Sequence, residues 1–258
     1  MILVDMSQIM MASIMMQMHM SKKSEPDEEM VRHMILNSLR MYRTRFLSEF
    51  GEMVLCYDSR HYWRRDYFPE YKHSRRKSRG TDDKNWDIIF NCLNTIKEEI
   101  KSNMPYKSVE VYGAEADDVI ATLCSESSNE VMILSGDKDF IQLQKFPNVK
   151  QYSPITKKMI NGMNPDDYLK EHVLKGDTSD GVPNVLSPDN TFVDGIRQRP
   201  LSKKKIATMV EGDFPNDEVK RNYQRNKKLI DLTCSPDELR SEILDTYKSA
   251  PVNDRSKI

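Results

Sequence analysis

Four short strand-like runs, separated by segments with helical patterns, constrain the fold of this 258-residue chain most strongly. The runs cover residues 2–4 (ILV), 54–57 (VLCY), 109–111 (VEV) and 131–134 (VMIL). The helical patterns cover residues 7–20, 27–48, 85–103, 115–126 and 138–145. Buried strands that alternate with helices are typical of a parallel sheet covered on both sides. We therefore predict an α/β fold: a twisted, mostly parallel sheet with helices on both faces.

Composition and cysteine positions restrict the class of protein. Lys and Arg total 39 against 40 Asp and Glu, and the mean hydropathy is −0.68. These values exclude a membrane-embedded protein and leave enough apolar residues for a core. The four cysteines have no CxxC spacing, and Cys56, Cys92 and Cys124 lie in apolar runs. We therefore expect buried, reduced thiols and a cytosolic protein.

The N-terminal segment, MILVDMSQIMMASIMM, is apolar and rich in methionine. No basic residues precede it, Asp5 interrupts it, and no apolar stretch reaches the roughly 20 residues of a membrane span. We expect no secretion signal and interpret the methionines as part of a helical core.

Acidic residues follow three of the four strand-like runs. Asp5 ends ILVD, Asp58 ends VLCYD, and Asp137 comes shortly after VMIL. In open parallel sheets, binding sites form beyond the carboxyl ends of the strands. A single aspartate at such a place is most often a helix N-cap, which is the simpler interpretation of each residue alone.

Other carboxylates come in closely spaced groups: Glu115, Asp117 and Asp118 in YGAEADDVIA, Asp139 beside Asp137, and Asp177 and Asp180 in LKGDTSDGVP. A first helical turn favours acids, but Glu115 and Asp118 would share one face and repel each other without a cation. Nine carboxylates from five segments are thus expected, most of them at one edge of the sheet. The alternative interpretation is that these residues are unrelated helix caps. That interpretation explains a single acid well but explains nine acids together poorly.

Converging carboxylates need a compensating charge, and hard divalent cations such as Mg²⁺ prefer oxygen ligands. Two such ions about 3.5–4 Å apart suit phosphodiester hydrolysis, because they stabilise the attacking and the leaving oxygen. The Cys and His spacings do not match a zinc site, and the absence of GxxxxGK[ST] disfavours an NTPase. The acids therefore predict a two-metal phosphodiesterase.

A basic segment at residues 60–79 combines eight Lys/Arg and two acidic residues with five aromatic residues. Cations for phosphates and aromatic faces for bases are what single-stranded nucleic acid requires. The alternative is a solvated basic loop with its aromatic residues in the core. The predicted nucleic-acid contacts in this segment are Arg64, Arg65, Arg76, Lys77 and Arg79.

After about residue 165 the sequence changes to helices and basic loops. We expect an α/β domain at 1–165 that includes the basic segment, and a helical region at 166–258. Ser202 is expected to cap a helix over Lys203–Val210, which would present backbone N–H groups to a phosphate. Lys203, Lys204 and Lys205 are the predicted duplex contacts.

The blocks ILVD, YDSR, YGAEADDVIA, LSGDKDFIQL and LKGDTSDGVP together resemble the acidic motifs of the flap endonuclease / 5′-nuclease family. The similarity covers about residues 1–245 and implies that family's twisted sheet as a catalytic domain at 1–165. It also implies a helix-hairpin-helix-like region at 166–258 that binds duplex DNA. The sequence departs from the family at one place. The usual glycine-rich turn after GVPNV is missing, and a polar insert at about 186–200 intervenes.

The resemblance implies a role for each matching residue. Asp5, Asp58, Glu115 and Asp117 resemble ligands of the first metal. Asp118, Asp137, Asp139, Asp177 and Asp180 resemble ligands near the second. The EYK phrase resembles the family's arch, so Lys72 and Arg75 resemble the cations that reach the scissile phosphate.

The resemblance also implies a function. It predicts a 5′→3′ exonuclease and flap endonuclease on RNA·DNA hybrid and duplex DNA, which removes RNA primers in lagging-strand replication. Two Mg²⁺ ions, replaceable by Mn²⁺, would be the cofactors. A monomer in the cytoplasm of a bacterial host is expected, with a single-strand-binding protein or a sliding clamp as partner.

Three other functions compete with this interpretation. A catalytically silent replication factor would need gaps in the acid set, and the sequence has none. A PIN-type ribonuclease is usually shorter and lacks the basic segment. That segment also disfavours an α/β phosphatase.

Overall fold

The computed structural model describes residues 1–253, leaving out the side chains of residues 76–78, and it contains a six-stranded sheet of order β3-β2-β1-β4-β5-β6. The strands are β1 (Ile2–Asp5), β2 (Met53–Cys56), β3 (Lys107–Val109), β4 (Val131–Leu134), β5 (Val149–Ser153) and β6 (Lys158–Ile160). Neighbouring strands run parallel except β5 and β6, which are antiparallel. The predicted mostly parallel α/β sheet is therefore confirmed.

Two details of the predicted strands were wrong. The run expected at 109–111 forms its strand earlier, at Lys107–Val109, and β5 and β6 were not predicted. β5 contains Lys150, Gln151 and Ser153, so it lacks a continuous apolar run. β6 lies at the sheet edge and is largely exposed, so its residues need not be apolar.

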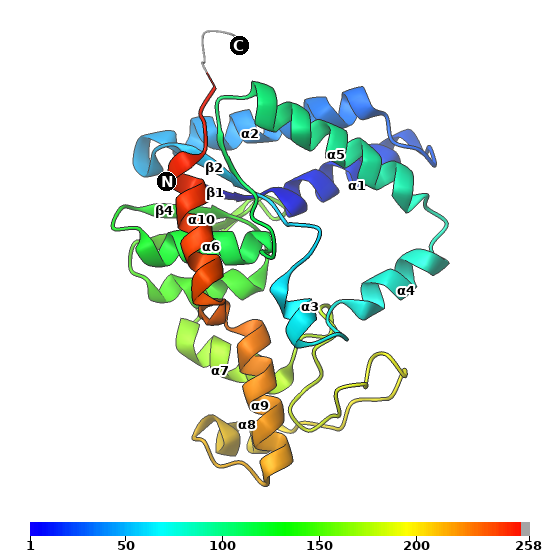
Figure 1. Cartoon of the computed structure of the whole chain (residues 1–258), viewed down its shortest axis with the longest axis vertical. Coiled ribbons are helices and arrows are strands. Elements are labelled where there is room, and N and C mark those ends of the chain that lie inside the picture. Colours follow the sequence, from blue (N-terminus) through cyan, green and yellow to red (C-terminus); the bar gives the residue numbers. More distant parts are fainter. Residues whose placement is uncertain (254–258) are drawn as a thin grey trace.

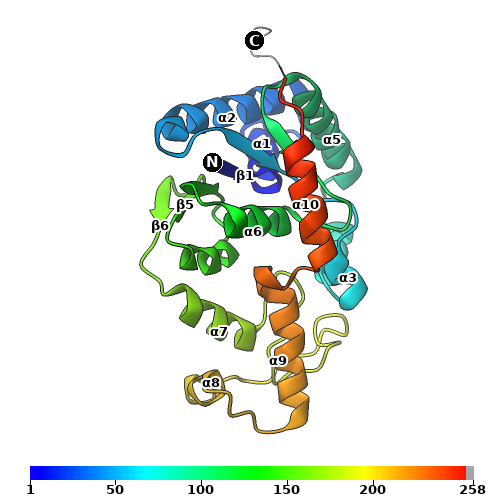
Figure 2. The ribbon, with the colours of Figure 1, turned by 60° about the vertical axis from the view of Figure 1, so that its left-hand side comes forward.

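Helices cover both faces of the sheet (Figure 2). One face packs against α1 (Met6–Ser21), α2 (Glu28–Phe50) and α5 (Trp86–Asn103). The other packs against α6 (Ala116–Glu126), η1 (Lys138–Lys145) and α10 (Asp237–Ser249). Within β1, Ile2 and Val4 belong to the first core and Leu3 to the second. Burial on both faces explains why the central strands are continuous apolar runs.

The predicted methionine and cysteine burial agrees in part with the structure. Met6, Met10 and Met18 of α1 are buried, whereas Met16 and Met20 are 57% and 73% exposed. Cys56, Cys92 and Cys124 are buried free thiols. None of the helices in residues 1–253 has the length and apolar character needed to cross a bilayer.

A smaller helical layer lies below the sheet in Figure 1. It consists of α7 (Pro165–Lys175), α8 (Lys203–Val210), α9 (Asp217–Ile230) and the short η2 (Leu232–Cys234). The basic segment forms α3 (Trp63–Tyr67) and α4 (His73–Thr81), and its Phe68 and Tyr71 pack against Val173 and Leu229 of the helical layer. These two aromatic residues are therefore core residues, as the alternative interpretation held.

The last helix does not stay with this layer. α10 runs back along α6, where Leu239 and Ile243 join the sheet core (Figure 2). A division of the chain at residue 165 remains a prediction.

Candidate metal centre

The carboxyl ends of the central strands bring the first acids to one edge of the sheet. Asp5 is the last residue of β1, Asp58 follows β2, and Asp137 follows β4; β1 pairs in parallel with both other strands. Each residue also caps a helix. Asp5 accepts from the Gln8 N–H at 3.0 Å, Asp58 from the Ala116 N–H at 2.7 Å, and Asp137 from the Asp139 N–H at 3.0 Å. The two interpretations, helix cap and shared acidic site, are therefore compatible, because the backbone hydrogen bonds hold these carboxylates at the shared edge.

The start of α6 supplies three more acids. Glu115 is its N-cap, and the Glu115 N–H donates to the Asp118 carboxylate at 2.9 Å in a capping box. The repulsion expected between these two side chains is relieved by Arg64. Its Nη1 lies 3.0 Å from Glu115 Oε2 and 2.8 Å from Asp118 Oδ2. Burial opposes ionisation of Asp118, but Arg64 lowers its pKa below the usual value.

This ion pair corrects two sequence assignments. Arg64, predicted to contact nucleic acid, is only 1% exposed and also donates to the Leu229 carbonyl at 2.9 Å. Asp118, predicted as a metal ligand, is fully buried and accepts from Arg64, the Trp63 indole and Ser235. Arg64 and Asp118 therefore hold the α6 terminus in place rather than face a substrate or an ion.

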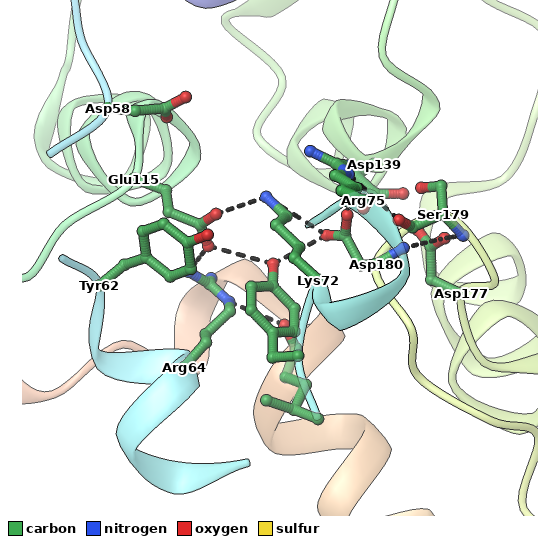
Figure 3. A network of polar contacts seen from close by, with 12 residues as sticks. Asp58, Tyr62, Arg64, Lys72, Arg75, Glu115, Asp139, Asp177, Ser179 and Asp180 are labelled. Atoms are coloured by element: carbon green, nitrogen blue, oxygen red, sulfur yellow. Dashed lines mark hydrogen bonds and ion pairs between the residues drawn. The ribbon is translucent and has the colours of Figure 1, made fainter. Parts of the chain in front are cut away.

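Lys72 and Arg75 of the basic segment lie among the remaining acids (Figure 3). Lys72 Nζ contacts Glu115 and lies 3.6 Å from Asp180 Oδ2, while Arg75 binds the other Asp180 oxygen and the Ser179 carbonyl. The Tyr71 hydroxyl donates to both Glu115 and Asp180. Sequence reasoning missed Tyr71 as a polar group of this site and counted it only as an aromatic residue.

Backbone contacts hold the basic segment against the last acidic loop. The Lys72 N–H donates to the Asp180 carbonyl at 2.7 Å, and Gly181 has a left-handed φ of 74°. A Cβ at residue 181 would lie 3.1 Å from the Glu70 carbonyl, so glycine allows this close approach. Lys72 itself has a φ of 56°, and these contacts maintain that unusual conformation.

Asp139 and Asp177 share a different neighbour, the imidazole of His172 on α7. Its Nε2 lies 3.0 Å from Asp139 Oδ1 and 3.8 Å from Asp177 Oδ2. Sequence reasoning missed this histidine, although it lies only five residues before Asp177. A small cavity connects these acids with those of α6, because its lining includes Asp117, Asp139, Asp177 and Asp180.

Four acids have no such neighbour. Among the described side chains, no ion pair involves Asp5, Asp58, Asp117 or Asp137. Burial and the nearby Asp58 raise the pKa of Asp5 to about 6. Burial, Asp137 and Glu115 raise the pKa of Asp117 well above its usual value. Uncompensated hard oxygen donors of this kind fit divalent cations.

Comparison with known proteins identifies the family. A family model described as the 5′-3′ exonuclease, N-terminal resolvase-like domain, matches residues 1–173. The chain belongs to the 5′-3′ exonuclease family. A second family model, which is described as T4 RNase H, C terminal, matches residues 165–258. The resemblance expected from the acidic motifs is thereby confirmed.

Individual relatives agree with this assignment. Ribonuclease H of Enterobacteria phage T4 is 34% identical over 99% of this chain and 88% of its own length. Flap endonuclease Xni of a Shewanella species is 29% identical over 48% of either chain. The flap endonuclease of bacteriophage T5, solved with DNA and metal ions, has the same fold, with a TM-score of 0.67 and 15% identity over 96% of this chain and 99% of that one.

The other residues that were predicted to contact nucleic acid lie at several places in the structure. Arg65 is half-buried and stacks on the Tyr62 ring, and Arg79 lies over the rings of Trp86 and Phe90. The side chains of Arg76 and Lys77 lie outside the described residues. Lys203, Lys204 and Lys205 are exposed in the first turn of α8. Ser202 caps that helix by accepting from the Lys205 N–H at 3.3 Å, as predicted.

Asp5→Asn is expected to stabilise the metal-free protein near neutral pH. The raised pKa means that ionising Asp5 opposes folding above about pH 6, and this cost disappears as the pH falls toward the ordinary value of 3.8. Asparagine keeps the cap of α1. The free energy of unfolding in EDTA should rise by about 3 kcal/mol at about pH 7.5 and by well under about 1 kcal/mol at about pH 4. An equal gain at both pH values would contradict charge repulsion.

Proposed function

We propose that this chain is a Mg²⁺-dependent, structure-specific 5′ nuclease that cleaves RNA·DNA hybrid, duplex DNA and flap DNA. In this proposal it removes RNA primers during lagging-strand replication in the cytoplasm of a bacterial host. The observation that supports it most directly is the group of four carboxylates that have no ion-pair partner among the described side chains, Asp5, Asp58, Asp117 and Asp137. They lie beside Glu115, Asp139, Asp177 and Asp180, which contact Arg64, Lys72, Arg75 or His172.

Each of two divalent ions would be held by acids from both sets. Asp5, Asp58, Glu115 and Asp117 would hold one ion, and Asp137, Asp139, Asp177 and Asp180 the other. When bound, the ions would stabilise the charge on the attacking and the leaving oxygen of the phosphodiester. Mn²⁺ would replace Mg²⁺, since both ions accept carboxylate and water ligands.

The arch cations would then act on the substrate. Burial opposes the charge on Lys72, but Asp180 and Glu115 raise its pKa above the ordinary value, so it stays protonated at neutral pH. Lys72 is therefore a cation for the scissile phosphate, and it cannot serve as the general base. Once Glu115 and Asp180 are otherwise compensated, its ammonium group is free to turn toward a phosphate oxygen, with Arg75 beside it.

Two parts of the chain would bind the nucleic acid. Arg65, Arg79, Arg76 and Lys77 of the basic segment would contact the single strand, and the first turn of α8 would contact the duplex backbone. A single-strand-binding protein or a sliding clamp would recruit the monomer to the replication fork.

Cleavage of a 5′-labelled RNA·DNA hybrid with Mg²⁺ or EDTA tests the proposal. Short 5′ products that require Mg²⁺ or Mn²⁺ are the expected result. Tight binding with no cleavage under either ion would instead identify a catalytically silent nucleic-acid-binding protein. Cleavage confined to single-stranded RNA would favour a PIN-type ribonuclease.

Replacing Lys203, Lys204 and Lys205 together by alanine is expected to weaken duplex binding and reduce its salt dependence. Each lost phosphate contact should reduce the slope of log K against log salt by about 0.9. The cleavage rate at saturating enzyme should stay near the wild-type rate. A salt series of binding constants measures the effect. Alanine at Lys22 and Lys23, two exposed lysines that directly follow α1, is the control. An unchanged slope in the triple variant would exclude α8 from the duplex interface.

A further inference from the structure

His172 occupies an unusual position beside Asp139 and Asp177, two of the acids proposed to hold the second ion. It lies in the last turn of α7, and its carbonyl accepts from the Gly176 N–H at 2.9 Å. Gly176 has a left-handed φ of 69°, and a Cβ there would collide with the Val182 and Pro183 carbonyls. Glycine therefore permits the turn that brings Asp177 back beside the imidazole.

The contact between His172 and Asp139 lacks the geometry of a hydrogen bond. Nε2 is buried and lies 3.0 Å from Asp139 Oδ1, yet it has no hydrogen-bond partner with acceptable direction. A buried polar atom without a directed partner is unusual in a folded protein. The imidazole nitrogen and the carboxylate oxygen both lie close to Asp177 Oδ2, the nitrogen at 3.8 Å.

The 3.0 Å between His172 Nε2 and Asp139 Oδ1 matches the spacing of adjacent ligands of one ion, and Asp177 Oδ2 lies somewhat farther away, at 3.8 Å from the nitrogen. Adjacent ligands of an octahedral ion with bonds of about 2.1 Å lie about 3 Å apart. One ligand atom from each of His172, Asp139 and Asp177 lies within 4.8 Å of the others. The Tyr168 ring, with its centroid 5.5 Å from the imidazole, limits how far the histidine can rotate away.

We infer that His172 is a nitrogen ligand of the cation held by Asp139 and Asp177, and that it makes this position prefer Mn²⁺ over Mg²⁺. The inference rests on the proposed function and specifies the metal preference of one of its two ion positions. Imidazole is a good ligand for transition metals, whereas Mg²⁺ prefers carboxylate, carbonyl and water oxygens. An all-carboxylate position would not discriminate between the two ions in this way.

Pulsed EPR of Mn²⁺ bound to the whole protein tests the inference directly. A ¹⁴N coupling from directly bound imidazole is expected, and labelling histidine alone with ¹⁵N should replace it by a ¹⁵N coupling. His172→Gln should lose the signal while still binding Mn²⁺. His33→Gln, which changes a histidine of α2 that contacts Asn37, should keep it. The wild-type spectrum alone decides the inference if the His172 variant fails to fold.

Calorimetric titration gives the selectivity. His172→Gln should weaken Mn²⁺ binding about tenfold or more, the loss expected for a disturbed metal site, and change Mg²⁺ binding less than about threefold. Mn²⁺ bound with no histidine nitrogen coupling, or equal losses for both ions, would overturn the inference and leave the proposed nuclease intact. Failure of the wild-type protein to bind either ion would overturn both.

Discussion

Asp137→Asn is expected to lower the single-turnover cleavage rate of an RNA·DNA hybrid by at least about 10³-fold, since a metal ion supplies several kcal/mol of transition-state stabilisation. Asp137 has no ion-pair partner among the described side chains, so its charge is available to a divalent ion. The amide oxygen of asparagine can still accept from the Asp139 N–H and keep the start of η1. The substitution therefore removes charge with little change in shape.

Substrate binding separates this loss from misfolding. The affinity of Asp137→Asn for the hybrid, measured in EDTA, should stay within a few-fold of the wild type, because one less negative charge also reduces repulsion of phosphate. Asp167→Asn, which replaces an exposed aspartate in the first turn of α7, is the matched control and should cleave at the wild-type rate. Turnover of Asp137→Asn at the wild-type rate would exclude the two-metal assignment.

The sheet and its acidic edge could be predicted because both depend on local patterns. Continuous apolar runs such as 131–134 mark strands that are buried on both faces, and parallel pairing places their carboxyl ends together. Asp5, Asp58 and Asp137 then converge without any knowledge of the loops. The repulsion between Glu115 and Asp118 was also visible as an i,i+3 pair, and it correctly indicated a nearby cation.

The identity of that cation could not be predicted, because it depends on tertiary packing. Arg64 lies 51 residues from Glu115 and belongs to a segment whose composition favours nucleic-acid binding. It is buried between α9, where the Leu229 carbonyl accepts from its Nε, and the carboxylates at the start of α6. The sequence pattern of a basic residue flanked by aromatic residues is the same whether that residue contacts a phosphate or a buried carboxylate.

His172 was missed for a related reason. Its helix offers one histidine among exposed polar residues, and a single histidine in such a pattern carries no metal-binding signal. The signal arises when the Gly176 turn folds Asp177 back and η1 presents Asp139 from another part of the chain. Arg64 and His172 thus each have a partner from a distant segment, Glu115 and Asp139 respectively.

In the proposed function, Lys72 would serve both the metal-free protein and the reaction. Without metal, its ammonium group neutralises Glu115 and approaches Asp180, at a position linked to the last acidic loop by the backbone. Bound cations would take over that neutralisation. The same charge would then be available to the phosphate that the cations bind, so Lys72 connects metal binding to substrate binding.

Lys72→Met is expected to slow single-turnover cleavage by about 10²–10³-fold at saturating enzyme and Mg²⁺, with a much smaller effect on substrate binding. A cation directed at the scissile phosphate acts mainly where negative charge develops in the transition state. Methionine keeps an unbranched apolar side chain and removes the ammonium group, which lies 5.5 Å from the Tyr62 ring centroid and 5.1 Å from that of Tyr71. Lys97→Met is the matched control, because Lys97 is also largely buried and paired with a carboxylate, Glu110.

Thermal unfolding adds a second, independent measurement on the same variant. In EDTA, Lys72→Met should unfold at a lower temperature than the wild type, because Glu115 and Asp180 lose a buried cationic neighbour. Saturating Mg²⁺ should remove most of that difference if the ions compensate the same carboxylates. A variant that cleaves at the wild-type rate once saturated would limit Lys72 to charge compensation. A stability loss that Mg²⁺ leaves unchanged would instead show that the ions and Lys72 do not share Glu115 and Asp180.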